Sequence, residues 1–110
     1  MSWKVEFYSI KVENDIKKWP VRIKAKFTWI VELIEKSGPS EIGMPHVKLL
    51  GRGLFEIRVK SDEGIARAPF CMIKGRIVIV LSGFIKKTQK TPVNEIELAK
   101  KRMEEVKKDG

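Results

Sequence analysis

The sequence predicts an α+β fold, with a small, mainly antiparallel sheet, two N-terminal helices packed on one face of it and a C-terminal helix. Three observations predict this class. Apolar residues recur at helical spacing over residues 11–37, they alternate or cluster as in strands over 54–84, and helical spacing returns over 92–106. Helices that flank a run of strands, rather than alternating with them, are typical of α+β domains. A length of 110 residues suits one such domain, spanning residues 1–110.

The first residues indicate a strand followed by a short helix. Apolar and polar residues alternate over 5–8, which is the period of a strand. Over 11–19, three apolar residues recur at spacings of four and three and would share one side of a helix; they are Val12, Ile16 and Trp19. Pro20 ends this helix and suits the first turn of the next one.

A longer helix is expected over residues 20–37. Residues 21–28 alternate strictly enough to form a strand, but the longer window favours a helix, because apolar residues from Ile23 to Ile34 recur at spacings of four, three and four. A Gly-Pro pair then stops the helix. Residues 38–53 hold four glycines and two prolines and are expected to form a loop.

Two strands with alternating faces are expected after this loop. In residues 54–60 the apolar side chains face one way, and three polar ones face the other: Glu56, Arg58 and Lys60. A turn at Asp-Glu-Gly leads to a strand over 66–72, whose apolar residues share a face and leave Arg67 on the opposite one. Arg58 and Arg67 would therefore lie on one open face of neighbouring strands.

The last strand and the terminal helix complete the predicted fold. An unbroken apolar run indicates a strand over 76–84 that is covered on both faces. Pro69 lacks the backbone donor that an interior strand needs, so we expect a bulge there. Thr91 suits a helix cap and Pro92 the first helical position. The apolar residues of the following helix recur at helical spacing; they are Ile96, Ala99, Met103 and Val106.

The charge of the chain favours a polyanionic partner. Lys and Arg number 23 against 14 Asp and Glu, which gives a formal net charge of +9 and a sequence pI near 9.8. Long-range attraction to nucleic acid or to an acidic protein follows. Charge alone is also compatible with a small basic domain that is merely soluble.

Cysteine content and hydropathy point to a cytoplasmic protein. Cys71 is the single cysteine, so it cannot form an internal disulfide and fits a reducing compartment as a small buried apolar residue. We find no apolar signal core at the N-terminus and no run of the roughly 20 apolar residues needed to span a bilayer.

The candidate site residues are cations at the end of the predicted sheet. Arg58 and Arg67 could together hold a phosphate and stabilise charge on a phosphorane-like transition state; alternatively each is solvated or pairs with Glu56. Lys86, Lys87 and Lys90 follow the last strand and could gather at one rim, or form only a solvated face.

These segments resemble the RelE/HigB superfamily of bacterial toxins, specifically its phage-derived HigB-like branch. The resemblance rests on the Gly-Leu-Phe-Glu-Ile-Arg run of residues 53–58, on Arg67, and on Phe-x-Lys-Lys-Thr-x-Lys-Thr-Pro over 84–92, followed by Glu-Ile-Glu-Leu-Ala. It implies a RelE-like fold. It also implies four catalytic residues in an RNA-cleaving cleft: Arg58, Arg67, Lys86 and Lys87.

Further residues near this predicted cleft are candidates for RNA binding. Lys48 lies just before the sheet, and Lys90 extends the lysine run. Thr88 and Gln89 could hydrogen-bond sugar or base. Phe84 could stack on a base or equally well belong to the core.

Proton transfer has two candidates in this sequence. His46, the single histidine, lies in the predicted loop and titrates in a range that suits acid–base work, although a lone loop histidine is usually just exposed. Many relatives carry a histidine or tyrosine near the last strand, and this chain has neither there. Glu56 is a carboxylate where some superfamily members have a cation, and it is a candidate proton acceptor.

The resemblance implies the toxin of a type II toxin–antitoxin system, a metal-independent endoribonuclease that cuts messenger RNA on the ribosome. Its partners would be the ribosome, messenger RNA and a cognate antitoxin of the helix-turn-helix type. No pattern in the sequence implies a metal or a nucleotide cofactor. The competing interpretation is a phage-derived basic adaptor that binds nucleic acid or protein without cleaving it.

Overall fold

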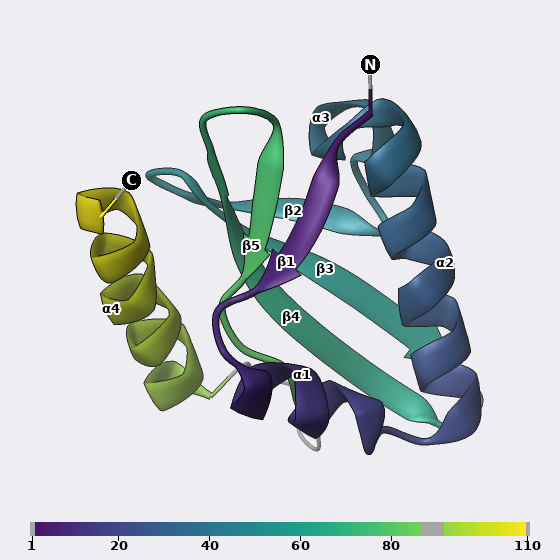
Figure 1. The fold of residues 1–110 in the computed structure, drawn as a ribbon. Coiled ribbons are helices and arrows are strands. Elements are labelled where there is room, and N and C mark those ends of the chain that lie inside the picture. Colours follow the sequence, from purple (N-terminus) through teal and green to yellow (C-terminus); the bar gives the residue numbers. More distant parts are fainter. Residues whose placement is uncertain (1, 87–91, 110) are drawn as a thin grey trace.

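The computed structural model describes residues 2–86 and 92–109. Its elements, in chain order (Figure 1), are β1 (Lys4–Phe7), α1 (Ile10–Lys17), α2 (Val21–Ser37), α3 (Pro39–Ile42), β2 (Val47–Gly51), β3 (Leu54–Ser61), β4 (Gly64–Ile73), β5 (Ile77–Val80), β6 (Phe84–Lys86) and α4 (Val93–Asp109). The predicted α+β class is confirmed. No helix in the described ranges combines the length and apolar character that crossing a membrane requires.

The strands form one mixed sheet in the order β1-β5-β4-β3-β2. β1 runs parallel to β5, and the other pairs are antiparallel. The long strand β4 lies in the middle: it pairs with β3 along one edge and with β5 and then β6 along the other. The sheet is therefore mainly antiparallel.

Helices lie on both sides of the sheet (Figure 1). Side chains of α1 and α2, among them Ile16, Ile23 and Ile30, share one buried cluster with Ile57 of β3 and Phe70 of β4. The opposite face, reached by alternation, forms a second cluster with α4, built from Leu54, Cys71, Ile79, Leu81 and Ala99. Cys71 is fully buried, as expected for a small apolar residue.

α4 is fixed to the sheet by polar contacts at the break between β5 and β6. Arg102 donates to the carbonyl of Leu81 (2.7 Å), and its guanidinium lies 4.8 Å from the centre of the Tyr8 ring. The hydroxyl of Ser82 donates to Glu95 (3.2 Å). These contacts set the position of α4 over the sheet.

The prediction of a loop over residues 38–53 is wrong, because the segment contains α3 and the edge strand β2. β2 is held by its register with β3, from Val47 opposite Ile57 to Gly51 opposite Leu54. Only Val47 of β2 is buried, so the segment has no alternating pattern of its own. Pairing with a neighbouring strand overrides the local preference of its glycines and prolines.

The expected single strand over 76–84 and the bulge at Pro69 are also wrong. The run is divided into β5 and β6, whereas β4 keeps an unbroken register with β3 through Pro69 opposite Glu56. In the register, Arg67 pairs with Phe84 and Phe70 pairs with Val80. Residues 68–69 of β4 therefore lie opposite three residues, 81–83, of the segment between β5 and β6. The carbonyl of Pro69 accepts from Leu81 (2.8 Å). The missing donor of Pro69 therefore faces the break between β5 and β6.

The start of α4 follows the prediction closely. The helix begins at Val93, and the carbonyl of Pro92 accepts the hydrogen bond of Ile96 (3.4 Å). Pro92 thus lies one position before the expected place. Thr91, the expected cap, lies outside the described residues.

Candidate functional site

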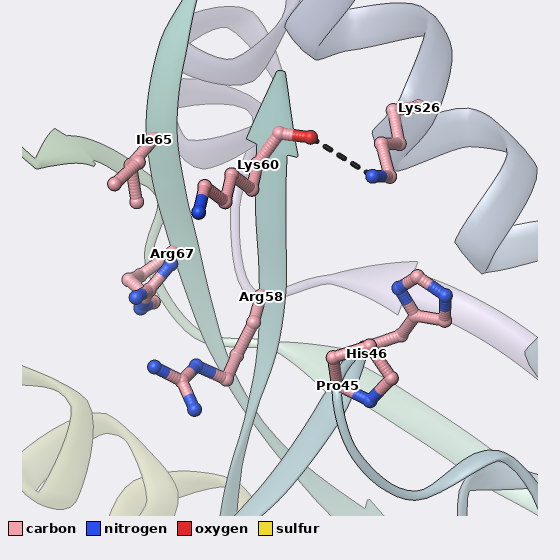
Figure 2. Close-up of a pocket in the computed structure, with 7 residues that line it drawn as sticks. All are labelled: Lys26, Pro45, His46, Arg58, Lys60, Ile65 and Arg67. Atoms are coloured by element: carbon pink, nitrogen blue, oxygen red, sulfur yellow. Dashed lines mark hydrogen bonds between the residues drawn. The ribbon is translucent and has the colours of Figure 1, made fainter.

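Arg58 and Arg67 lie directly opposite each other on β3 and β4. Residues in this relation have Cβ atoms about 5 Å apart and share a face of the sheet. Figure 2 shows both guanidinium groups on the same side of the strand pair. The predicted common face is therefore present, but it is not open at Arg67, which is only 5% exposed. The alternation of side chains along a strand predicts the face of the sheet on which Arg67 lies, but it does not predict whether other residues cover that face.

Glu56 joins the two arginines into one ion cluster, in which Glu56 and Arg67 are buried and Arg58 is partly exposed. Its Oε1 lies 3.5 Å from Nε of Arg67 and 3.7 Å from Nε of Arg58. Like charges directly opposite each other destabilise a sheet, and the carboxylate offsets this repulsion. Glu56 is 3% exposed, and its other oxygen, Oε2, is buried without a hydrogen-bond partner among the described residues. One carboxylate oxygen therefore lies buried beside two guanidinium groups, without a hydrogen-bond partner in the part of the chain that the structure describes.

The site retains an excess of positive charge despite Glu56. Burial and the positive charge of Arg58 lower the pKa of Arg67, while Glu56 acts in the opposite direction. Burial first, and then the charges of Arg67 and Arg58, lower the pKa of Lys86 at the end of β6. The repulsion among these cations would be relieved by a bound anion.

These side chains line a cavity of about 410 Å³ between β2, β3, β4, β6 and α4, which we call the cleft. Glu56, Arg58 and Arg67 lie along it, with Lys48, Lys86 and Lys100 as further cations and Leu50, Leu54 and Ile96 as apolar walls. With guanidinium and ammonium groups on several sides, the cleft suits a phosphate group.

A second cavity adjoins the cleft and shares Arg58 and Arg67 with it. This cavity, which we call the side cavity, measures about 260 Å³ (Figure 2). Its remaining lining residues are Lys26, Pro45, His46, Lys60 and Ile65.

The structure separates His46 from the ion cluster. Its backbone carbonyl accepts from the amide of Arg58 (2.8 Å), but its ring packs edge-on against Trp29 at 5.2 Å. Figure 2 shows the ring on the side of β3 away from the two guanidinium groups. Between the two candidates for proton transfer, Glu56 is the one that lines the cleft.

Of the other predicted RNA-binding residues, one lines the cleft, one is buried and the rest lie outside the described residues. Lys48 is exposed and lines the cleft. Phe84 is 8% exposed and lies opposite Arg67 in the register, so its ring is part of the buried structure. Four candidates lie outside the described residues: Lys87, Thr88, Gln89 and Lys90.

Three lysines of the two cavities are not among the predicted site residues. Lys60 could have been found, because strand alternation puts it on the side of Arg58. Lys100 lies one helical turn after Ile96, which is the face of α4 that adjoins the cleft. Lys26 comes from α2, and no local pattern connects it with β3. In the described ranges, no group of three or more His, Cys, Asp or Glu side chains could hold a metal.

Comparisons with known proteins agree with this fold. Residues 14–104 match the family described as phage derived protein Gp49-like (DUF891). Escherichia coli toxin RelE, solved in the free state as a double arginine-to-alanine mutant, is 16% identical with a TM-score of 0.66, over 93% of this chain and 98% of that one. The RelE of an archaeal RelE–RelB complex from Pyrococcus horikoshii OT3 is 20% identical with a TM-score of 0.58, over 79% of this chain and 98% of that one. Curated protein sequences gave no match. The chain therefore belongs to the phage-derived Gp49-like family and has the fold of the RelE/HigB toxin superfamily.

Proposed function

We propose that this protein is the toxin of a type II toxin–antitoxin pair, a cytoplasmic and metal-independent endoribonuclease that cuts messenger RNA on the ribosome. One observation carries the proposal: an Arg58–Glu56–Arg67 ion cluster, with Glu56 and Arg67 buried, lines a cationic cleft on a RelE/HigB fold. Such a cluster combines charge for a phosphate with an oxygen that can accept a proton.

The proposed reaction is an internal transfer within the RNA strand. The 2′-oxygen attacks the adjacent phosphorus and gives its proton to Oε2 of Glu56, while the guanidinium groups of Arg58 and Arg67 stabilise the charge on the phosphoryl oxygens. The bond from phosphorus to the 5′-oxygen breaks, and Lys86 donates a proton to that oxygen. The products are a 2′,3′-cyclic phosphate and a 5′-hydroxyl.

The ribosome would supply the geometry of the strand. In-line attack requires that the 2′-oxygen, the phosphorus and the leaving oxygen be held in register, which contributes a large part of the rate in such reactions. Lys87, which the resemblance assigns to catalysis, and Lys48 would hold the phosphate backbone. Net charge of +9 favours docking to ribosomal RNA, with an affinity that falls as salt rises.

A cognate antitoxin would silence the enzyme. The archaeal neighbour is a RelE–RelB complex, which supports a partner protein for this chain as well. An antitoxin with acidic side chains that covers the cleft would both neutralise its charge and block RNA.

A non-catalytic adaptor is the second candidate function. It is favoured by the pairing of Glu56 with two arginines, which a purely structural ion cluster would also show. A small adjacent reading frame that encodes a helix-turn-helix protein would favour the toxin.

Inducible expression with mapping of transcript 5′ ends tests the proposal. A toxin arrests growth and creates new 5′ ends inside translated frames. An adaptor leaves transcripts uncut at any level of expression, and that result would overturn the assignment.

Replacing Lys86 with arginine is expected to move the pH dependence of cleavage. Lys86 can donate a proton to the leaving oxygen only while its ammonium group is protonated, so the cleavage rate should fall as pH rises through its pKa. Because the pKa of Lys86 is lowered, this fall begins at a lower pH than for an ordinary lysine. Arginine stays charged, so K86R should move the loss to higher pH and reduce the plateau rate by about tenfold, less than removing a general acid outright. Single-turnover cleavage on stalled ribosome complexes measures both effects. An unchanged pH profile would assign Lys86 to backbone binding alone.

A further inference from the structure

The side cavity has a lining that is cationic and free of carboxylates. Lys26, Lys60 and the shared Arg58 and Arg67 line it, and none of its lining residues is Asp or Glu. Neither Lys26 nor Lys60 forms an ion pair with a described residue. In the cleft, by contrast, Glu56 offsets part of the positive charge.

The backbone of β3 sets how these cations are spaced. Lys60 follows Arg58 by two residues, so both side chains project from the same side about 6.6 Å apart along the strand. Figure 2 shows Lys60, Arg58 and Arg67 on this common side. The spacing is about the reach of one nucleotide in an extended strand.

Lys26 reaches the cavity from α2 across the edge of β3. The register between β2 and β3 ends at Ile57, so the carbonyl of Lys60 is not used by β2. Lys26 Nζ donates to that carbonyl (2.9 Å), which fixes the ammonium group and leaves two of its hydrogens for a ligand.

We propose that the side cavity binds a backbone phosphate of single-stranded RNA, one nucleotide from the phosphate held in the cleft. Resting on the proposed function, this places the strand across the shared arginines, with Lys60 as the main contact and Lys26 at the edge. Pro45 and Ile65 give the cavity apolar walls that suit a ribose. Two adjoining cavities with a common cationic wall match the successive phosphates of a covalent backbone better than the irregularly placed carboxylates of an acidic protein.

The test compares the salt dependence of RNA binding in two double variants. K26A/K60A removes both lysines of the side cavity. K36A/K74A removes the same charge at two exposed lysines that line neither cavity. Fluorescence anisotropy follows the binding of a 2′-O-methylated RNA oligomer, which cannot be cleaved by 2′-attack. A poly-glutamate peptide serves as the acidic-protein probe, and cleavage of a translated transcript by the wild type is measured alongside.

K26A/K60A should flatten the salt slope for RNA by about 0.7, the contribution of the one phosphate that the side cavity holds on a single strand. Between about 50 and 200 mM salt, wild-type affinity should then fall about 2.6-fold more than that of the variant. K36A/K74A should keep the wild-type slope. Equal flattening in both variants, no RNA binding by the wild type, or a loss confined to poly-glutamate would each overturn the subsite. A subsite that passes while the wild type cuts no translated transcript would instead reject the proposed function.

Discussion

Replacing Arg67 with alanine is expected to abolish growth arrest and to destabilise the fold. Loss of a group that stabilises transition-state charge typically lowers the rate by about 10²–10³-fold. Arg67 is also buried beside Glu56, so its removal leaves the carboxylate with Arg58 as its remaining partner, and the loss of stability should be less than the roughly 3–5 kcal/mol of a buried charge that loses its only partner. Cleavage of translated transcripts and the free energy of unfolding measure the two effects.

R67K separates catalysis from stability. It keeps a positive charge beside Glu56, so part of the lost stability should return, whereas cleavage should stay low because an ammonium group cannot form the two-pronged contact of a guanidinium with a phosphate. Arg58 is about a quarter exposed, so R58A should lose less stability than R67A. A folded R67A protein that cuts at the wild-type rate would remove Arg67 from the catalytic assignment.

Replacing Glu56 with glutamine is expected to reduce cleavage by about 10²–10⁴-fold, the usual contribution of a positioned general base. Glutamine keeps the size of the side chain but cannot accept the proton of the 2′-hydroxyl. Loss of the negative charge leaves the cleft more positive, so RNA binding should be unchanged or tighter. Single-turnover cleavage and anisotropy on the same protein distinguish the two quantities.

The control for Glu56 is aspartate, which keeps the charge on a shorter side chain. E56D should retain the ion pairs better than E56Q and lose less stability, so the unfolding free energies of the two variants report the structural part. If E56Q cuts as fast as the wild type, Glu56 is only the counter-ion of the arginines.

The sequence predicts which side chains line the cleft better than it predicts how deeply they are buried. The two-residue period of strands puts Glu56, Arg58 and Arg67 on one side of β3 and β4. α4 lines the same cleft with Ile96 and Lys100, and it joins the sheet from a distant part of the chain through the hydrogen bond from Arg102 to Leu81. Local periodicity carries no information on such a contact.

The incorrectly predicted strands have the same cause. β2 and β6 are short, and each is held in a strand conformation by its hydrogen bonds to a longer neighbour: β2 to β3, and β6 to β4. The missing backbone donor of Pro69 predicted a bulge in β4, whereas the extra residue lies in the segment between β5 and β6 that faces it. Long amphipathic helices such as α2 need no partner to reveal their period, and their prediction was confirmed.

The most direct test of ribosome-dependent cleavage is to incubate one transcript with purified protein, with and without translation. A chelator that is selective for transition metals is present and leaves the ribosome its Mg²⁺. Naked RNA should stay largely intact, whereas the translated transcript should be cut to leave a 2′,3′-cyclic phosphate or its 3′-phosphate product. Efficient cutting of naked RNA would contradict the ribosome requirement. No cutting in either condition, with tight RNA binding retained, would contradict the enzyme itself and favour the adaptor.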